Sequence, residues 1–131
     1  MNTGSQKKTY VDGFLKNSNP SDKGGFTICN NKDCKSYPIK QKDLTNNQVE
    51  IMACIIGMMG KRKTIISDSQ LAVNCLNGKW KSRDYRLQPL VHLGRIILEI
   101  RKKELIWERR DTNLAGIYNE EYHKKIIKQL F

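Results

Sequence analysis

Apolar residues recur with two different periods along the chain, and these periods separate predicted strands from predicted helices. Alternating patterns rich in β-branched and aromatic residues predict strands at residues 9–15, 24–29 and 34–39. Turn-rich segments join these strands, so we expect an antiparallel meander. An acid, Asp12, stands in the middle of the first strand, which is unusual because a lone buried charge is costly.

The remaining chain alternates between helical and extended patterns. Helices are predicted to begin at Thr45 or Asn46, at Gln70, at Leu90 and at Asn113, with strands at residues 64–66 and 105–108. We expect two apolar stripes to face the core: Val49, Met52, Ala53, Ile56 and Met59, and Leu93, Ile96, Ile97 and Ile100. This order of elements indicates one α/β domain over residues 1–131, with a flexible start at residues 1–7.

Two acids, Asp68 and Glu50, lie near the starts of predicted helices, where each could either take part in a functional site or cap the helix. Asp68 follows the apolar strand 64–66 directly, at the carboxyl end, where open α/β sheets place their ligands. The alternative is that Asp68 only caps the next helix, a position that Ser67 or Ser69 could also fill. Glu50 lies in the first or second turn of its helix, where a capping-box or dipole role is the alternative.

The charge of the chain is strongly positive. Lys and Arg number 24 against 13 acids, a formal net charge of +11, which favours polyanionic partners and above all nucleic acid. Residues 79–103 carry eight of these cations beside the aromatic residues Trp80 and Tyr85, although a solvated helix face is the alternative. No apolar run is long enough to span a membrane, so we expect no membrane partner and no signal peptide.

The four cysteines favour a reducing compartment. Cys29 and Cys34 flank a predicted hairpin turn, where a zinc pair is possible but lacks a second pair of ligands. Cys54 and Cys75 lie on apolar helix faces and are predicted to be core thiols. We therefore expect reduced thiols and a cytoplasmic protein.

Three motifs together resemble the type 1 ribonuclease H family. They are Asp12-Gly13 on the first strand, the helix start Thr45-Asn46-Asn47-x-x-Glu50, and Ser67-Asp68-Ser69-Gln70, in the family's order across nearly the whole chain. The resemblance implies a ribonuclease H-like mixed five-stranded sheet, three antiparallel strands followed by two parallel ones, flanked by helices. It also implies a monomeric endonuclease that hydrolyses the RNA strand of RNA–DNA hybrids.

The resemblance further implies a set of site residues. Asp12, Glu50 and Asp68 would hold two Mg²⁺ or Mn²⁺ ions, with Asp12 bridging them, and the products would carry a 5′-phosphate and a 3′-hydroxyl. Carboxylate oxygens suit these metals, and two ions suit in-line displacement at phosphorus. Substrate contacts are expected from two groups: Gly13, Asn46, Asn47 and Gln70 near the acids, and Lys79, Trp80, Lys81, Arg83 and Arg86 in the basic segment.

The chain also departs from the family pattern. Gly116 stands where many members carry a fourth acid, and we expect Glu120, one helical turn later, to replace it as catalytic residue and metal ligand. Asp111 is the other candidate, and a partnership of Glu120 with Lys124 is the alternative that needs no catalysis. Arg109 and Arg110 stand where many members have a flexible-loop histidine. The missing acid leaves a second function open: an inactive ribonuclease H-like module that binds nucleic acid or accompanies a polymerase or reverse transcriptase.

Overall fold

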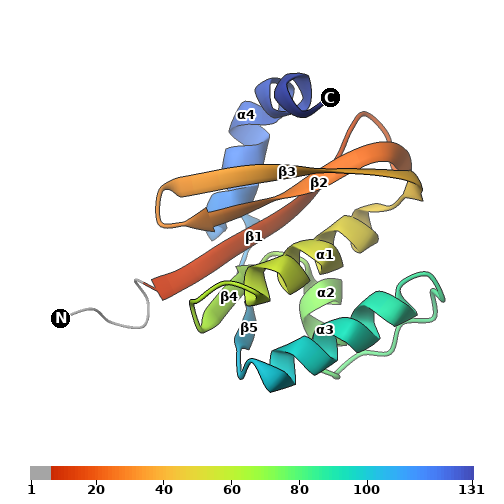
Figure 1. Cartoon of the computed structure of the whole chain (residues 1–131), viewed down its shortest axis with the longest axis vertical. Helices are drawn as coiled ribbons and strands as arrows, with labels where there is room; N and C mark the ends of the chain where they lie inside the picture. Colours follow the sequence, from red (N-terminus) through yellow and green to blue (C-terminus); the bar gives the residue numbers. More distant parts are fainter. Residues whose placement is uncertain (1–6) are drawn as a thin grey trace.

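A mixed five-stranded sheet forms the centre of the computed structural model, which describes residues 7–131 (Figure 1). The strands are β1 Lys8–Leu15, β2 Ser21–Asn30, β3 Asp33–Leu44, β4 Thr64–Ser67 and β5 Glu104–Trp107, in the spatial order β3-β2-β1-β4-β5. The first three pair antiparallel, and β4 is parallel to both β1 and β5. The predicted sheet is confirmed, whereas the predicted flexible start falls, apart from Lys7, outside the described residues.

Helices cover both faces of this sheet. They are α1 Asn46–Met58, α2 Gln70–Leu76, α3 Gln88–Ile100 and α4 Leu114–Leu130, with a short 3₁₀ helix, η2 Arg110–Thr112, before the last. Successive strand residues point to opposite faces. On β1, Val11 and Gly13 meet α1, whereas the side chain of Asp12 reaches α4. Asp12 therefore points away from the main core and toward the last helix.

The predicted apolar stripe of α1 is only partly correct. Val49 and Ala53 are buried as expected, but Ile56 and Met59 are exposed, and the helix instead buries Ile51, Ile55 and Met58. The reason is position: α1 contacts the sheet on one side and α2 and α3 on the other. A helix packed from two sides buries a wider arc than the single stripe of a surface helix.

The inward face predicted for α3 is wrong. Leu93, Ile96 and Ile100 are 48%, 41% and 73% exposed, and only Ile97 of that set is half-buried. The helix approaches its neighbours through Gly94, where an added Cβ would collide with a Leu76 methyl group. Because the closest approach is at a glycine, the buried line of α3 does not follow its largest apolar side chains. Among residues 7–131, no helix is long and apolar enough to cross a membrane.

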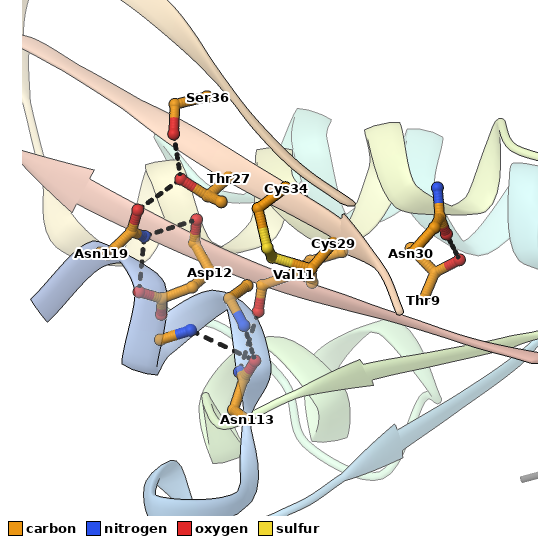
Figure 2. Close-up of a disulfide and its surroundings, with 12 residues drawn as sticks. Thr9, Val11, Asp12, Thr27, Cys29, Asn30, Cys34, Ser36, Asn113 and Asn119 are labelled. Atoms are coloured by element: carbon orange, nitrogen blue, oxygen red, sulfur yellow. Dashed lines mark hydrogen bonds between the residues drawn. A yellow bond between two sulfur atoms is a disulfide. The ribbon is translucent and has the colours of Figure 1, made fainter. Parts of the chain in front are cut away.

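The prediction of reduced thiols is wrong for one pair. Cys29 and Cys34 form a disulfide that closes the β2–β3 hairpin (Figure 2). The two residues lie directly opposite each other in the antiparallel register, which brings their Cα atoms to 4.1 Å. With the sulfurs bonded to each other, this pair offers no thiolates to zinc. Cys54 and Cys75 are free and buried, as predicted.

Candidate active site

Three acids from separate elements meet at the carboxyl end of β4. Asp12 comes from the middle of β1, Glu50 from the second turn of α1, and Asp68 from the residue after β4. One carboxylate oxygen of each lies within 4.8 Å of those of the other two. The parallel pairing of β1 and β4 places Asp12 beside the end of β4, because Val11 pairs with Ser67. These three predicted residues are therefore brought together by the fold.

The capping alternatives for two of these acids are wrong. The cap of α2 is Ser69, whose hydroxyl accepts the backbone N–H of Ala72 at 3.1 Å. The cap of α1 is Thr45, which forms a capping box with Gln48. Both helix starts are satisfied without a carboxylate. Asp68 and Glu50 are thus available for another role.

Glu50 is fixed by the glycine that follows Asp12. The backbone N–H of Gly13 donates to Glu50 Oε1 at 2.5 Å. A Cβ on Gly13 would lie 2.6 Å from the carbonyl carbon of Val49 and 2.8 Å from the backbone nitrogen of Glu50. The backbones of β1 and α1 therefore touch at this point. Gly13, predicted as a substrate contact, also has this structural role.

Two oxygen atoms of the cluster are buried without a hydrogen-bond partner among the described residues: Asp12 Oδ1 and Asp68 Oδ2. The nearest positive group is Arg110, whose Nη1 lies 3.8 Å from the first and 3.6 Å from the second. Its side chain is 56% exposed, so its charge is largely screened by water. Buried charges without partners are costly. The donor set, hard anionic oxygens with free lone pairs, fits a divalent cation such as Mg²⁺ or Mn²⁺.

The same burial and crowding shift the acids toward their neutral forms. Burial, together with the charge of Asp68, raises the pKa of Asp12 to about 6, although Asn119 and Arg110 act in the opposite direction. Burial and the charge of Asp12 raise the pKa of Glu50 well above its usual value. Burial also raises the pKa of Asp68. Like charges held this close stay ionised only when a cation compensates them.

We expect the metal-free protein to lose stability as the pH rises from about 4 to about 7. The pKa of Asp12 is about 6 in the folded protein and 3.8 for an ordinary aspartate, as in the unfolded chain, so the folded state binds more protons between these pH values. Proton binding to Asp12 therefore stabilises the folded state by at most about 3 kcal/mol. This stabilisation is complete below the lower pKa and lost above the higher one. Thermal unfolding in EDTA should show Asp12→Asn gaining stability relative to the wild type as the pH rises. A constant difference from pH 4 to pH 8 would contradict this expectation.

At position 116, where the family pattern has a fourth acid, this chain has a glycine. A Cβ on Gly116 would lie 3.0 Å from Asp68 Oδ2, so this glycine does stand beside the cluster. Glu120 is on the wall of the adjoining pocket, with its side chain 74% exposed and its carboxylate 4.0 Å from Arg110 Nε. Within the described chain, no ion pair joins Glu120 to Lys124. Asp111 is exposed and pairs with Arg109 at 2.9 Å.

The other predicted residues lie in three places: at the pocket, at the starts of two helices, and on the basic segment. A pocket of about 340 Å³ is lined by Asp12, Gly13, Glu50 and Asn46, which brings Asn46 to the acids. Asn47 and Gln70 are exposed in the first turns of α1 and α2. The basic residues Lys79, Lys81, Arg83 and Arg86 and the half-exposed Trp80 lie on the segment between α2 and α3, and Arg86 pairs with Asp84 at 3.7 Å.

Sequence reasoning missed the part played by α4 and the turn before it. Arg110 contacts two of the acids, and Asn119 donates to Asp12 Oδ2 at 2.9 Å. Asn113 caps α4 and also donates to the backbone oxygen of Val11 at 3.0 Å, which ties the helix to β1. His123 also lines the pocket beside the acids. The available signal was the spacing of Asn119, one turn after Gly116 on the same side of the helix.

Known proteins resemble the chain in both sequence and fold. No family model matches the chain. A ribonuclease H of Lachnoclostridium phytofermentans is 35% identical over 82 residues, 54% of this chain, and the chain spans about half the length (51%) of this curated relative.

Two solved structures share the fold. Ribonuclease H1 of the archaeon Halobacterium salinarum has a TM-score of 0.68 and 24% identity, with 89% of this chain and 97% of that chain covered. LC11 ribonuclease H1 in complex with an RNA/DNA hybrid has a TM-score of 0.64 and 20% identity, with 81% and 87% covered. The architecture is thus the ribonuclease H fold, as the motifs predicted.

Proposed function

We propose that this chain is a metal-dependent endonuclease that hydrolyses the RNA strand of RNA–DNA hybrids. The observation that carries the proposal is the cluster of Asp12, Glu50 and Asp68, in which two buried oxygens have no hydrogen-bond partner. Two similarities support it: the sequence similarity to a protein named ribonuclease H, and the shared fold of a ribonuclease H1 solved with an RNA/DNA hybrid. We propose that it acts as a single-domain monomer.

The proposed metal site takes two Mg²⁺ or Mn²⁺ ions. Asp12, Glu50 and Asp68 would hold them, and Asp12 Oδ1 and Asp68 Oδ2 are the oxygens without a hydrogen-bond partner among the described residues. When bound, two such ions supply a water nucleophile of lowered pKa and stabilise the leaving oxygen in a displacement at phosphorus. The chain itself holds the carboxylates in place, through the N–H of Gly13 on Glu50 and the amide of Asn119 on Asp12, and both hydrogen bonds favour the ionised forms. The proposed products carry a 5′-phosphate and a 3′-hydroxyl.

The fourth charge of the site is proposed to come from Glu120. Its long side chain lies on the pocket wall, and side chains on a helix lean toward the N-terminus, which here is the direction of Gly116. Arg110, between Glu120 and the two aspartates, is well placed to meet a phosphate oxygen. Because Glu120 is exposed, we expect it to contribute less than the three buried acids.

Recognition of the hybrid is proposed to combine amide side chains with a basic surface. Asn46, Asn47 and Gln70 would contact sugar and base edges in the minor groove, where a 2′-hydroxyl both donates and accepts hydrogen bonds. Gly13 lines the same pocket as Asn46, and its backbone would contact the strand. Lys79, Lys81, Arg83 and Arg86 would neutralise phosphates, and Trp80 would pack against a sugar or base.

Cleavage of a labelled hybrid tests the proposal directly. With Mg²⁺ or Mn²⁺, the purified protein is expected to cut the RNA strand and to leave duplex DNA of the same sequence intact, as judged on a denaturing gel. Cleavage should cease in EDTA. Hybrid binding without cleavage at any metal concentration would favour the other candidate, a non-catalytic binding module, for which Gly116 in place of an acid is the supporting observation.

The basic segment should control affinity for the hybrid rather than the rate of cleavage. Replacing Lys79, Lys81 and Arg83 with Ala should lower the slope of log affinity against log salt by up to about one for each phosphate that is no longer neutralised. Arg86 is left in place because it already pairs with Asp84. The matched control replaces Lys32, Lys35 and Lys61, exposed residues around the start of β3 and before β4 that form no ion pair within residues 7–131. An equal change of slope in the two triple variants would mean that the segment is an ordinary charged surface.

A further inference from the structure

A chain of hydrogen bonds links the β2–β3 hairpin to the proposed metal site (Figure 2). Ser36 of β3 lies 2.6 Å from the hydroxyl of Thr27 on β2, and Thr27 donates to Oδ1 of Asn119 on α4. The amide nitrogen of Asn119 donates in turn to Asp12 Oδ2 at 2.9 Å. Thr27, Asn119 and Asp12 are all buried. The chain therefore connects three strands and a helix through side chains that are buried, except for the half-buried Ser36.

With the amide of Asn119 oriented as in the structure, this hydrogen-bond chain runs in one direction. Thr27 has a single hydroxyl proton, which it gives to Asn119, so Ser36 must be the donor to Thr27. With its carbonyl oxygen held by Thr27, Asn119 can present only its NH₂ group to Asp12. An NH₂ group needs an acceptor, and the ionised carboxylate of Asp12 is the best available one. The hydrogen bonds to Thr27 and Asp12 together hold Asn119 in this orientation, which favours a charged Asp12.

We propose that Asn119 is a positioning residue for the metal-binding carboxylate of Asp12. By holding Oδ2, it fixes the carboxylate and leaves Oδ1 free, and Oδ1 is the oxygen that has no hydrogen-bond partner. Asn119 follows Gly116 by three residues, so α4 supplies a neutral amide to the cluster one turn beyond the position where an acid is missing. This inference rests on the proposed metal site and adds to it a residue that supports a ligand without touching the metal.

Mn²⁺ binding in the absence of nucleic acid tests the role of Asn119. Free Mn²⁺ is measured by electron paramagnetic resonance during titration of the wild type, Asn119→Ala and a matched control, Asn30→Ala. Asn30 also bonds a β-strand threonine, accepting from Thr9 at 2.7 Å, but it lies at the other end of the β1–β2 pair, away from the carboxylate cluster (Figure 2). We expect Asn119→Ala to weaken Mn²⁺ binding about 10- to 100-fold, the usual cost of losing a partner of a metal ligand, and Asn30→Ala to leave it unchanged.

A second variant separates positioning from folding. Thr27→Val keeps the shape of the side chain but removes the hydroxyl that orients Asn119, and we expect Mn²⁺ affinity to fall in the same direction by a smaller factor. At saturating Mn²⁺, both variants should retain the wild-type KM for the hybrid, and melting curves by circular dichroism report whether they fold. If Asn119→Ala does not fold, Thr27→Val carries the test.

Each outcome supports or overturns the proposal. Wild-type Mn²⁺ affinity in both Asn119→Ala and Thr27→Val would overturn it, as would an equal loss in Asn30→Ala. A wild type that binds no Mn²⁺ would overturn the metal site itself. A wild type that binds Mn²⁺ in an Asn119-dependent way but cleaves no hybrid would support the positioning role and refute the proposed activity.

Discussion

Asp12→Asn is expected to reduce cleavage of the hybrid by more than about 1000-fold while leaving its binding intact. Loss of a partner that only supports a metal ligand typically costs about 10- to 100-fold, and Asp12 is itself a proposed metal ligand. Its unpartnered Oδ1 is the atom most available to a metal, and asparagine offers there either a neutral oxygen or an amide group. Hybrid affinity should persist because the basic surface is unchanged.

Single-turnover cleavage and fluorescence anisotropy of a labelled hybrid measure these two effects separately. The matched control is Asp33→Asn, which removes the same charge at the exposed start of β3, in the turn beside the disulfide. This control should cleave like the wild type. Wild-type turnover of Asp12→Asn at saturating metal would show that the reaction does not use this carboxylate.

Gly13→Ala is expected to destabilise the protein by more than about 3 kcal/mol. Overpacking a core usually costs about 1–3 kcal/mol because side chains can shift, but here the added methyl group would meet backbone atoms of Val49 and Glu50 at 2.6 and 2.8 Å. To make room, α1 must move away from β1, which breaks the bond from the Gly13 N–H to Glu50. The same change should therefore weaken metal binding.

Urea unfolding of Gly13→Ala and Gly60→Ala provides the comparison. Gly60 follows α1, and the nearest atom to an added Cβ there is 3.5 Å away, an ordinary contact. We expect Gly60→Ala to change the free energy of unfolding by less than about 0.5 kcal/mol. A loss below about 1 kcal/mol in Gly13→Ala would mean that α1 can adjust its position on the sheet without strain.

The existence and order of the elements could be predicted from the sequence because they depend on local patterns. The alternation in β1 and the cap at Thr45 are properties of a few neighbouring residues. The meeting of Asp12, Glu50 and Asp68 was predicted through the resemblance, since it depends on strand order and not on spacing alone. The structure brings these three acids together.

The errors arose where a distant part of the chain decides the outcome. Apolar spacing marks a helix face but cannot say that α3 approaches its neighbours through Gly94, so Leu93 and Ile100 were placed on the wrong side. The cysteine pair is an exception, because Cys29 and Cys34 are only five residues apart, and whether they face each other depends on the register of one hairpin. Asn119 was missed because its partners, Thr27 and Asp12, are 92 and 107 residues away in the sequence.

The position of the disulfide limits how strongly thiol chemistry can affect the fold. Cys29 and Cys34 are five residues apart, and closing so short a loop restricts the unfolded chain by only about 2 kcal/mol in the chain-entropy model. The hairpin also keeps its backbone ladder when the bond is reduced. Exchange with the remaining thiols is blocked, because Cys54 and Cys75 are buried and burial raises the pKa of both, which leaves few thiolates to attack the disulfide. The chain therefore has a single disulfide pairing open to it in the native state, and reduction of that pair should leave the carboxylate cluster assembled.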